Sequence, residues 1–373
     1  MSVVQQMKPL VWNTLAKWQK INNIRLFSNA SIERRNELFT KEQNRQRELV
    51  GRIEKIEVRY LGLPEDVTLI MNRDLSTPYN CAQHLSEGHC KRSALALIDG
   101  NVPWDMHRPL PDNCTLQLLN FTVADPHVVN KAFWRTCSFM LGAALQNAFK
   151  EEARLQLHSF PGPNIKSGSF VHDIVLGSKT WQASNEELRA LSAEMIKLAA
   201  KDLKLERLEV NNELALEMFK DSRYKSEQLP SISQQNHGRV VLYRMGKHID
   251  ISRGPMVASS RFLGKCTVTA AHKLADEGAN DALYRIQGVA LPVGFVLNHV
   301  AYGSLEDRAR KLIFAWQWQR KYSRVSLSSP HALHTSESAR PILHICARNP
   351  VCPIINPARQ PNEPFEEMHT QMA

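Results

Sequence analysis

The stretch GKHIDISRGPMV (residues 246–257) predicts a short strand that runs into a tight turn. Apolar and polar residues alternate in HIDI, and the alternation stops at Arg-Gly-Pro (253–255), because glycine and proline both favour turns. Such a turn often presents side chains to a small-molecule pocket. The best placed residues, Ser252 and Met256, are poor metal ligands and have no obvious catalytic partner. The stretch therefore predicts the backbone of a pocket that lacks catalytic and metal-binding side chains.

Length and composition indicate a globular protein of two domains plus terminal segments. The chain has 373 residues, of which 43% are hydrophobic and 23% are charged. No apolar run reaches the roughly 18 residues of a membrane span. The net charge of +10 favours an acidic partner, most commonly a nucleic acid. The seven cysteines include no Cys-x-x-Cys pair, which argues against a disulfide framework and favours a reducing compartment.

The N-terminal segment has the composition of a mitochondrial transit peptide. Its first acidic residue is Glu33, and apolar residues recur at helical spacing between residues 7 and 18. Four basic residues precede Glu33: Lys8, Lys17, Lys20 and Arg25. We expect cleavage after Phe27, so that residues 1–27 are removed and the protein works in the mitochondrial matrix. A basic amphipathic helix that binds a membrane surface or RNA is the alternative.

Residues 28–52 predict a charged helix. Acidic and basic residues are interspersed along it, as on a helix that faces solvent or a partner, and we expect a surface helix. A second, weaker candidate surface for partners consists of its arginines: Arg34, Arg35, Arg45, Arg47 and Arg52.

Residues 53–122 predict a small sheet with a helix packed across it. IEKIEVRYL alternates as a strand does, and TLIMNR can form a second strand. Ser76 and Thr77 can cap a short helix that has Pro78 near its first turn. Further strands surround a turn at residues 99–100. This order predicts a half-open, ubiquitin-like sheet of the β-grasp type.

Residues 125–303 predict a larger α+β domain. A long helix over residues 125–150 carries apolar residues along one face. Ser184 and Glu187 form a capping box for a second helix. Strand patterns then dominate residues 238–298. The whole chain is thus expected to be α+β, with a β-grasp domain followed by a larger mixed domain.

The β-grasp segment resembles the TGS domain of threonyl-tRNA synthetases. In that family a strand ends at a glycine-containing turn, and a Trp-Asp-Leu and a Pro-Leu pattern follow. Here DG (99–100), WDM (104–106) and PL (109–110) stand in those places, and LQLLNF (116–121) stands for the closing strand.

The larger domain resembles the editing domain shared by threonyl- and alanyl-tRNA synthetases. The matching strings are WRTCSFMLGAAL (134–145), SGSFVHDIVL (167–176), ALEMFKDSRYK (215–225), HIDISRGP (248–255) and YRIQGVA (284–290). The chain that follows is too short for the adenylation domain of a synthetase. The resemblance therefore covers only the N-terminal half of such an enzyme.

The residues that carry out editing in that family are replaced in this chain. The family uses a His-x-x-x-His pair on the long helix and a Cys-x-x-x-His pair after the strand, since imidazole or thiolate must ligate or deprotonate water near neutral pH. Arg135 and Phe139 stand at the first pair, and Ser252 and Met256 at the second. Arginine stays protonated and Ser252 has no aligned histidine. The resemblance thus implies no catalytic residue, no metal and no cofactor.

One other cluster has metal-ligand chemistry. The string CAQHLSEGHC places Cys81, His84, His89 and Cys90 close together. Their spacing is not that of a known zinc finger, so packing within the small domain is the favoured interpretation and metal binding stays open. The chain contains no Gly-rich phosphate loop and no Gly-x-Ser-x-Gly motif.

A final helix, predicted over residues 304–324, combines basic and aromatic side chains. Such side chains suit phosphate contact and base stacking, or a protein interface. The candidate contacts with RNA or a protein partner are Arg308, Arg310, Lys311, Trp316, Trp318, Arg320, Lys321 and Arg324. The aromatic residues could instead cover the core of the larger domain. Residues 325–373 predict a mostly disordered tail.

Together these segments resemble a ribosomal protein of the mitochondrial large subunit that is built on the front half of a synthetase. The resemblance implies a structural, non-enzymatic role with two kinds of partner, namely large-subunit ribosomal RNA and neighbouring ribosomal proteins. It implies no membrane span and no small-molecule substrate. The alternative is a free-standing mitochondrial factor that binds tRNA or edits mischarged aminoacyl-tRNA. The sequence does not say which ribosomal neighbours the protein would contact.

Overall fold

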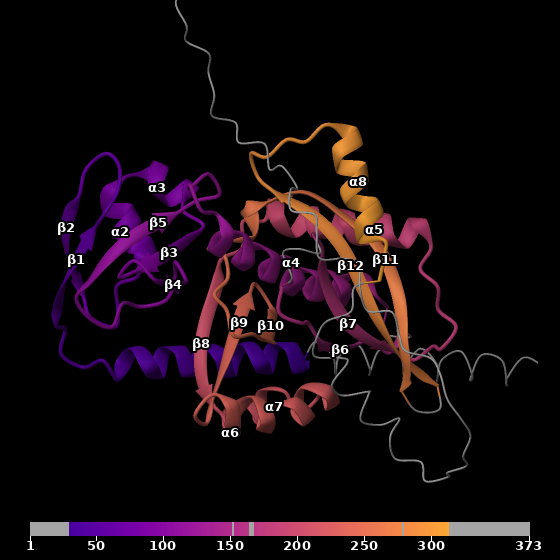
Figure 1. The fold of residues 1–373 in the computed structure, drawn as a ribbon. Coiled ribbons are helices and arrows are strands. Elements are labelled where there is room, and N and C mark those ends of the chain that lie inside the picture. The colour runs from indigo at the N-terminus through magenta and orange to yellow at the C-terminus, as the bar shows by residue number, and fades with distance from the viewer. Residues whose placement is uncertain (1–29, 151–152, 164–167, 278–279, 313–373) are drawn as a thin grey trace, which may run out of the picture. The chain divides into compact units, whose positions relative to one another are not determined.

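A computed structural model describes residues 30–150, 153–163, 168–277 and 280–312 (Figure 1). All of them belong to one compact unit, Met1–Arg320, whereas the second unit, Lys321–Ala373, contains no described residue. The predicted transit peptide and the predicted tail therefore lie outside the described residues. Among the helices that are described, none is long and apolar enough to cross a membrane.

The first sheet has the predicted β-grasp arrangement. Its strands are β1 (Lys55–Tyr60), β2 (Val67–Asn72), β3 (Leu95–Ile98), β4 (Val102–Trp104) and β5 (Cys114–Leu119), in the order β2-β1-β5-β3-β4. β1 and β5 pair in parallel, and the other neighbours are antiparallel. The helices α2 (Pro78–Leu85) and α3 (Glu87–Arg92) join β2 to β3. The predicted cap is present, because Thr77 accepts a hydrogen bond from the backbone N–H of Asn80.

The second sheet forms the centre of the larger domain. It is antiparallel, in the order β11-β12-β7-β6. The strands are β6 (Gln156–Ser159), β7 (Phe170–Leu176), β11 (Leu263–Glu277) and β12 (Asp281–Pro292). Helix α4 (His127–Ala148) packs on β7, and α5 (Asn185–Ala200) packs on β11 and α4. The predicted capping box starts α5, with Ser184 and Glu187 each accepting a backbone hydrogen bond from the other.

The third sheet carries the stretch at residues 246–257. It contains β8 (Leu205–Asn211), β9 (Arg239–Met245) and β10 (His248–Ile251) in the antiparallel order β10-β9-β8. Helices α6 (Asn212–Met218) and α7 (Arg223–Gln235) pack against this sheet, and a short 3-10 turn, η4 (Ser260–Phe262), leads into β11. Its apolar cluster includes Leu208, Met218, Leu242 and Ile249.

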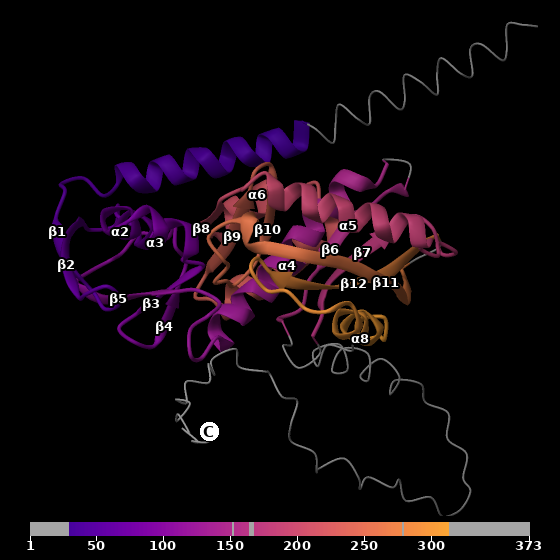
Figure 2. The same cartoon turned by 90° about the horizontal axis from the view of Figure 1, so that it is seen from above.

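A helix over residues 30–48 completes this cluster, through a buried face that the sequence analysis did not predict. The predicted surface helix (28–52) has one buried face: Phe39 is fully buried in the third-sheet cluster and Arg35 is 8% exposed. The helix runs beside the third sheet in both views (Figures 1 and 2). The interspersed charges in the sequence did not reveal the buried face, because a few apolar residues are enough to anchor a helix on a sheet.

The β-grasp sheet and the larger domain share one continuous core. One cluster of buried residues includes Val58 and Leu116 of the first sheet together with Leu141 of α4 and Ile174 of β7. The backbone also connects them, since the N–H of Ala258 donates to the carbonyl of Ala94 at 2.9 Å. The two predicted parts are therefore packed directly against each other.

The last described helix, α8 (His299–Ala309), differs from the predicted helix at 304–324. It begins earlier because Asn298 caps it, accepting from the N–H of Ala301 at 2.7 Å. It ends at Ala309, where the side-chain amide of Gln287 donates to the carbonyls of Ala309 and Lys311 at 2.5 and 2.7 Å. Residues 313–324 of the prediction lie outside the described residues.

Candidate functional site

The four positions that the resemblance assigns to an editing site lie on α4 and in the turn after β10. Gly254, in that turn, has a φ of +65°, and a Cβ there would lie 1.8 Å from the hydroxyl oxygen of Tyr243, so only glycine fits. Arg135 crosses from α4 to the turn, and its Nη1 donates to the carbonyl of Pro255 at 2.8 Å. Burial lowers the pKa of the Arg135 guanidinium. Arg135 therefore ties a helix to the turn and leaves no base there.

Aromatic and apolar side chains occupy the other replaced positions. Phe139 is fully buried and packs edge-on against His248, with ring centroids 4.7 Å apart. Met256 is 1% exposed, and its backbone N–H donates to Asp105 at 2.8 Å. Ser252 is 8% exposed, and its hydroxyl accepts from the N–H of Gly254 at 3.4 Å. Among the described residues, no histidine is hydrogen-bonded to the Ser252 hydroxyl, so the described part of this pocket has no activated nucleophile.

Two buried histidines remain next to Phe139. Nδ1 of His172, on β7, lies 2.9 Å from the carbonyl of Ser138, and Nδ1 of His248 lies 2.7 Å from Oε1 of Gln146. Burial lowers the pKa of His172 to about 4 and that of His248 to about 3. Both rings are therefore neutral near pH 7, and such low pKa values make them weak bases. Their Nε2 atoms are buried and have no hydrogen-bond partner within the described structure.

A buried ion pair at this site was missed by the sequence analysis. Nζ of Lys225 lies 2.6 Å from Oδ1 of Asp250, and the two side chains are 4% and 1% exposed. Burial raises the pKa of Asp250, but the interactions with Lys225, His172 and His248 together outweigh burial, so this pKa lies below its ordinary value. Both residues occur in strings that matched the editing domain. The available signal was the presence of a charged residue in each string, Lys225 in the first and Asp250 in the second.

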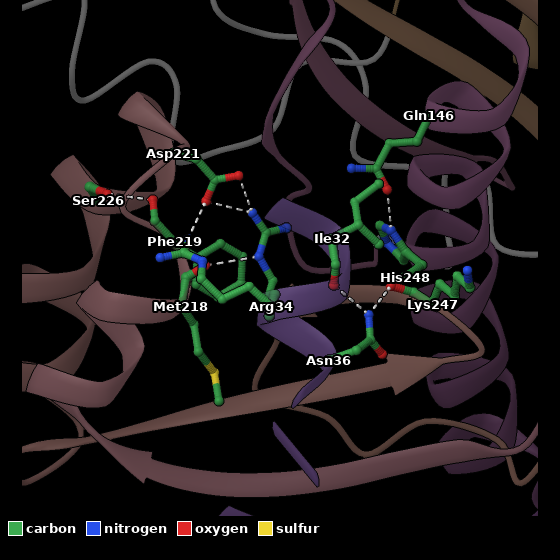
Figure 3. A network of polar contacts seen from close by, with 11 residues as sticks. Ile32, Arg34, Asn36, Gln146, Met218, Phe219, Asp221, Ser226, Lys247 and His248 are labelled. Atoms are coloured by element: carbon green, nitrogen blue, oxygen red, sulfur yellow. Dashed lines mark hydrogen bonds and ion pairs between the residues drawn. The ribbon is translucent and has the colours of Figure 1, made fainter. Parts of the chain in front are cut away.

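The N-terminal helix forms one wall of a cavity beside this pair. The cavity has a volume of about 340 Å³ and is lined by residues that include Ile32, Arg35, Gln146 and Asp250. Figure 3 shows Ile32 and Asn36 of the helix lying between Phe219 and Asp221 on one side and Gln146 and His248 on the other. The helix therefore covers this side of the former pocket.

Charged contacts hold the helix in that position. Nη2 of Arg35 binds both carboxylate oxygens of Asp221 at 2.9 and 3.0 Å, and its Nε donates to the carbonyl of Met218 at 2.9 Å. The amide of Asn36 donates to the carbonyl of Lys247 at 2.8 Å (Figure 3). Arg35, predicted as part of a partner-facing surface, is instead used inside the molecule.

The predicted basic and aromatic surface is only partly described. Arg308, Arg310 and Lys311 are exposed at the end of α8, and Arg310 forms an ion pair with Asp307. The remaining candidates, Trp316, Trp318, Arg320, Lys321 and Arg324, lie outside the described residues. This surface therefore stays a prediction.

The Cys-His cluster of the β-grasp domain is not assembled into one site. Cys81 is fully buried, and burial raises the pKa of its thiol to about 12. His84 points away from that core and is exposed, whereas His89 contacts the hydroxyl of Ser86 and the carbonyl of Leu63. Across the part of the chain that the structure describes, no group of three or more potential ligands could hold a metal ion.

Known proteins resemble this chain in both of its parts. Residues 66–120 match the TGS domain family. The large ribosomal subunit protein mL39 of Drosophila melanogaster is 71% identical over 313 residues, which cover 83% of this chain and 94% of that protein. The chain belongs to the mL39 family. This identity confirms the predicted family and, because mL39 is named as a ribosomal protein, also the prediction that the chain is not an enzyme.

The relation of this mL39-family chain to synthetases is more distant. The probable cytoplasmic threonine–tRNA ligase 1 of Dictyostelium discoideum is 30% identical over 233 residues, 62% of this chain and 31% of that protein. The human cytoplasmic threonine–tRNA ligase 1 is 32% identical over 222 residues, 58% of this chain and 28% of that protein. The chain thus spans less than a third of each ligase. These matches confirm the α+β, synthetase-like fold class.

Proposed function

We propose that the chain is a structural component of the large subunit of the mitochondrial ribosome, located in the matrix. The observation that carries this proposal is the high identity to Drosophila mL39 over nearly the whole of that protein. The transit-peptide composition of residues 1–27 and the net charge of +10 support the location and an anionic partner. Ribosomal RNA and neighbouring ribosomal proteins are the proposed partners.

The proposed contact surface for RNA or protein begins at the end of α8. Arg308, Arg310 and Lys311 are exposed there, and more basic and aromatic residues follow in the sequence. Exposed guanidinium and ammonium groups bind phosphates without reading sequence, which suits a ribosomal protein that neutralises RNA charge.

The geometry of the former pocket supports a structural role over hydrolysis. Hydrolysis of an aminoacyl ester needs a base whose pKa lies near neutral pH, or a metal-bound water. Here Phe139 and Met256 fill the space, Arg135 is held by the turn, and the histidines have strongly lowered pKa values. An editing factor would require a different set of side chains.

The first test is sedimentation of a mitochondrial lysate through a sucrose gradient at about 0.5 M salt, which strongly weakens simple phosphate contacts. We expect the protein to remain with the large subunit. Sedimentation at the top of the gradient in wild-type lysate would contradict the proposal. In that case, binding and deacylation of mischarged tRNA by the purified protein would be measured next.

A further inference from the structure

The loop between β12 and α8 exposes a run of apolar side chains. Figure 1 shows it as the orange segment that joins these two elements. Val296 is 92% exposed and Val300 is 78% exposed. The other exposed apolar residues of the loop are Val293 (56%), Phe295 (45%) and Leu297 (40%). These five residues are nearly half of the eleven large apolar residues that are exposed in the described structure. Such a cluster of exposed apolar side chains indicates a binding surface for a partner.

The backbone of this apolar loop (residues 292–300) is held at both ends. The N–H of Val293 donates to the carbonyl of Phe262 at 2.9 Å, and the N–H of Phe295 donates to the carbonyl of Pro292 at 3.2 Å. Gly294, with a φ of +91°, makes the reversal possible. At the other end Asn298 caps α8. The side chains are thus presented on a preorganised turn, which reduces the entropy lost when a partner binds.

The charge around the apolar loop argues against RNA as its partner. The sequence contains no Lys, Arg, Asp or Glu between Arg285 and Glu306. The exposed Lys265 lies near the start of α8, but its Nζ is 3.7 Å from the centroid of the Tyr302 ring and so engages in a cation–π contact. RNA affinity depends on phosphate neutralisation, whereas the centres of protein interfaces are depleted of charge and enriched in aromatic residues.

We propose that the apolar loop is a docking surface for another protein of the large ribosomal subunit. Its tip, Phe295 and Val296, would insert into a concave, uncharged groove on that protein, because Val296 projects almost entirely from this chain. The docking surface rests on the proposed function. The two ends of α8 then differ in role: the apolar N-terminal end contacts protein, and the basic C-terminal end is the surface proposed for RNA or protein.

The experiment places a photo-crosslinking amino acid at position 300 of the full-length chain in cells. Large subunits are purified at high salt, irradiated and analysed by mass spectrometry. We expect crosslinks to one protein of the large subunit. The double substitution Phe295→Ser and Val296→Ser should lower the crosslink yield about tenfold or more, since central apolar side chains dominate binding. Leu63→Ser is the matched control, because Leu63 is 84% exposed outside the apolar loop, and it should leave the yield unchanged.

The outcomes separate this proposal from the proposed function. Crosslinks to RNA, to another segment of this chain or to a second copy of it would overturn the docking surface. So would an absence of crosslinks when the chain that carries the crosslinker, without other substitutions, is retained on the large subunit. Wild-type protein that does not sediment with the large subunit would overturn the proposed function itself. The thermal midpoint of the purified double variant should equal that of wild type, because the replaced side chains are exposed.

Discussion

At the scale of single residues, the larger domain of this mL39-family chain contains two buried ion pairs. Lys225 and Asp250 are almost completely excluded from water and neutralise each other. A second pair, Arg285 and Asp173, is equally buried, with contacts of 2.7 and 2.8 Å. Buried pairs contribute little net stability when intact, but removing one member leaves an uncompensated charge. Each charge in such a pair is therefore needed for the stability of the fold, and a catalytic role is not required to explain it.

Asp250→Asn should therefore destabilise the protein strongly. Lys225 would be left charged and buried, and we expect the free energy of unfolding to fall by about 3–5 kcal/mol. Urea unfolding followed by circular dichroism measures this. Lys225→Met combined with Asp250→Asn should recover much of the loss. The control is Glu87→Gln, which breaks the exposed Lys91–Glu87 pair and should have no measurable effect. An equally small effect of Asp250→Asn would contradict the burial and the pairing of Lys225 with Asp250.

The two neutral histidines predict a pH dependence of stability. Their folded pKa values, about 4 for His172 and about 3 for His248, lie below the unfolded value of about 6.5. The unfolded chain therefore binds more protons below that value, so this contribution to stability is present above about pH 6.5 and is lost as the pH falls toward 4.

The measurement is the urea midpoint from pH 7 to pH 4.5. We expect it to decline on acidification in wild type and to decline less steeply in the variant His172→Gln with His248→Gln. The neighbouring Asp250 changes charge mainly below this window, because its pKa lies below the ordinary value. Identical slopes for wild type and variant would contradict the neutral, buried state of the rings.

At the scale of elements, the N-terminal helix shows how a charged sequence can be internal to the fold. Its Phe39 face packs on the third sheet, and Arg244 of β9 lies over the Phe39 ring at 4.3 Å while donating to Thr40 at 2.7 Å. Gln46 adds a bond to the carbonyl of Glu209 at 2.8 Å. The helix is therefore part of the larger domain and closes one side of its pocket.

Arg35→Met should loosen this helix. The change removes the Arg35 contacts with the Asp221 carboxylate and the Met218 carbonyl. We therefore expect the free energy of unfolding to fall by about 1–3 kcal/mol. Amide hydrogen exchange should show faster exchange over residues 30–48. Arg45→Met is the matched control, because the exposed Arg45 side chain is paired with Glu42 of the same helix and not with the third sheet, and it should leave exchange unchanged. Equal exchange in the two variants would argue against the anchoring role of Arg35.

At the scale of the whole molecule, the β-grasp sheet and the larger domain form one unit. Asp105, in the segment after β4, is only 5% exposed and accepts from the Tyr243 hydroxyl and the Met256 N–H, both at 2.8 Å. Burial raises the pKa of Asp105. The same carboxylate thus joins the β-grasp domain to the turn that carries the replaced editing residues.

This continuity predicts a single cooperative unfolding transition for the two parts. Differential scanning calorimetry of the full chain should give one peak whose calorimetric and van't Hoff enthalpies agree. Asp105→Ala should lower the midpoint, because a buried N–H and a buried hydroxyl lose their acceptor. Two separate peaks in wild type would contradict the shared core.

The sequence by itself was sufficient for the elements and the family. Local features depend on residue propensity and on side chains close together in the chain, so they could be predicted. The structure contains the helix caps at Thr77 and Ser184, the apolar face of α4 and the strand within residues 248–255. The assignment of Arg135, Phe139, Ser252 and Met256 to the editing positions concerns residue identity alone, and it stays a prediction.

Only the tertiary structure decided which charges are buried and where segments distant in the chain meet. Arg35 and Asp221, and also Lys225 and Asp250, are far apart in sequence, so their pairing depends on how α7 and the N-terminal helix pack on the third sheet. The end of α8 likewise depends on Gln287, a residue of a neighbouring strand. Local patterns record hydrophobicity and propensity, whereas burial and pairing are set by contacts that form only when the chain has folded.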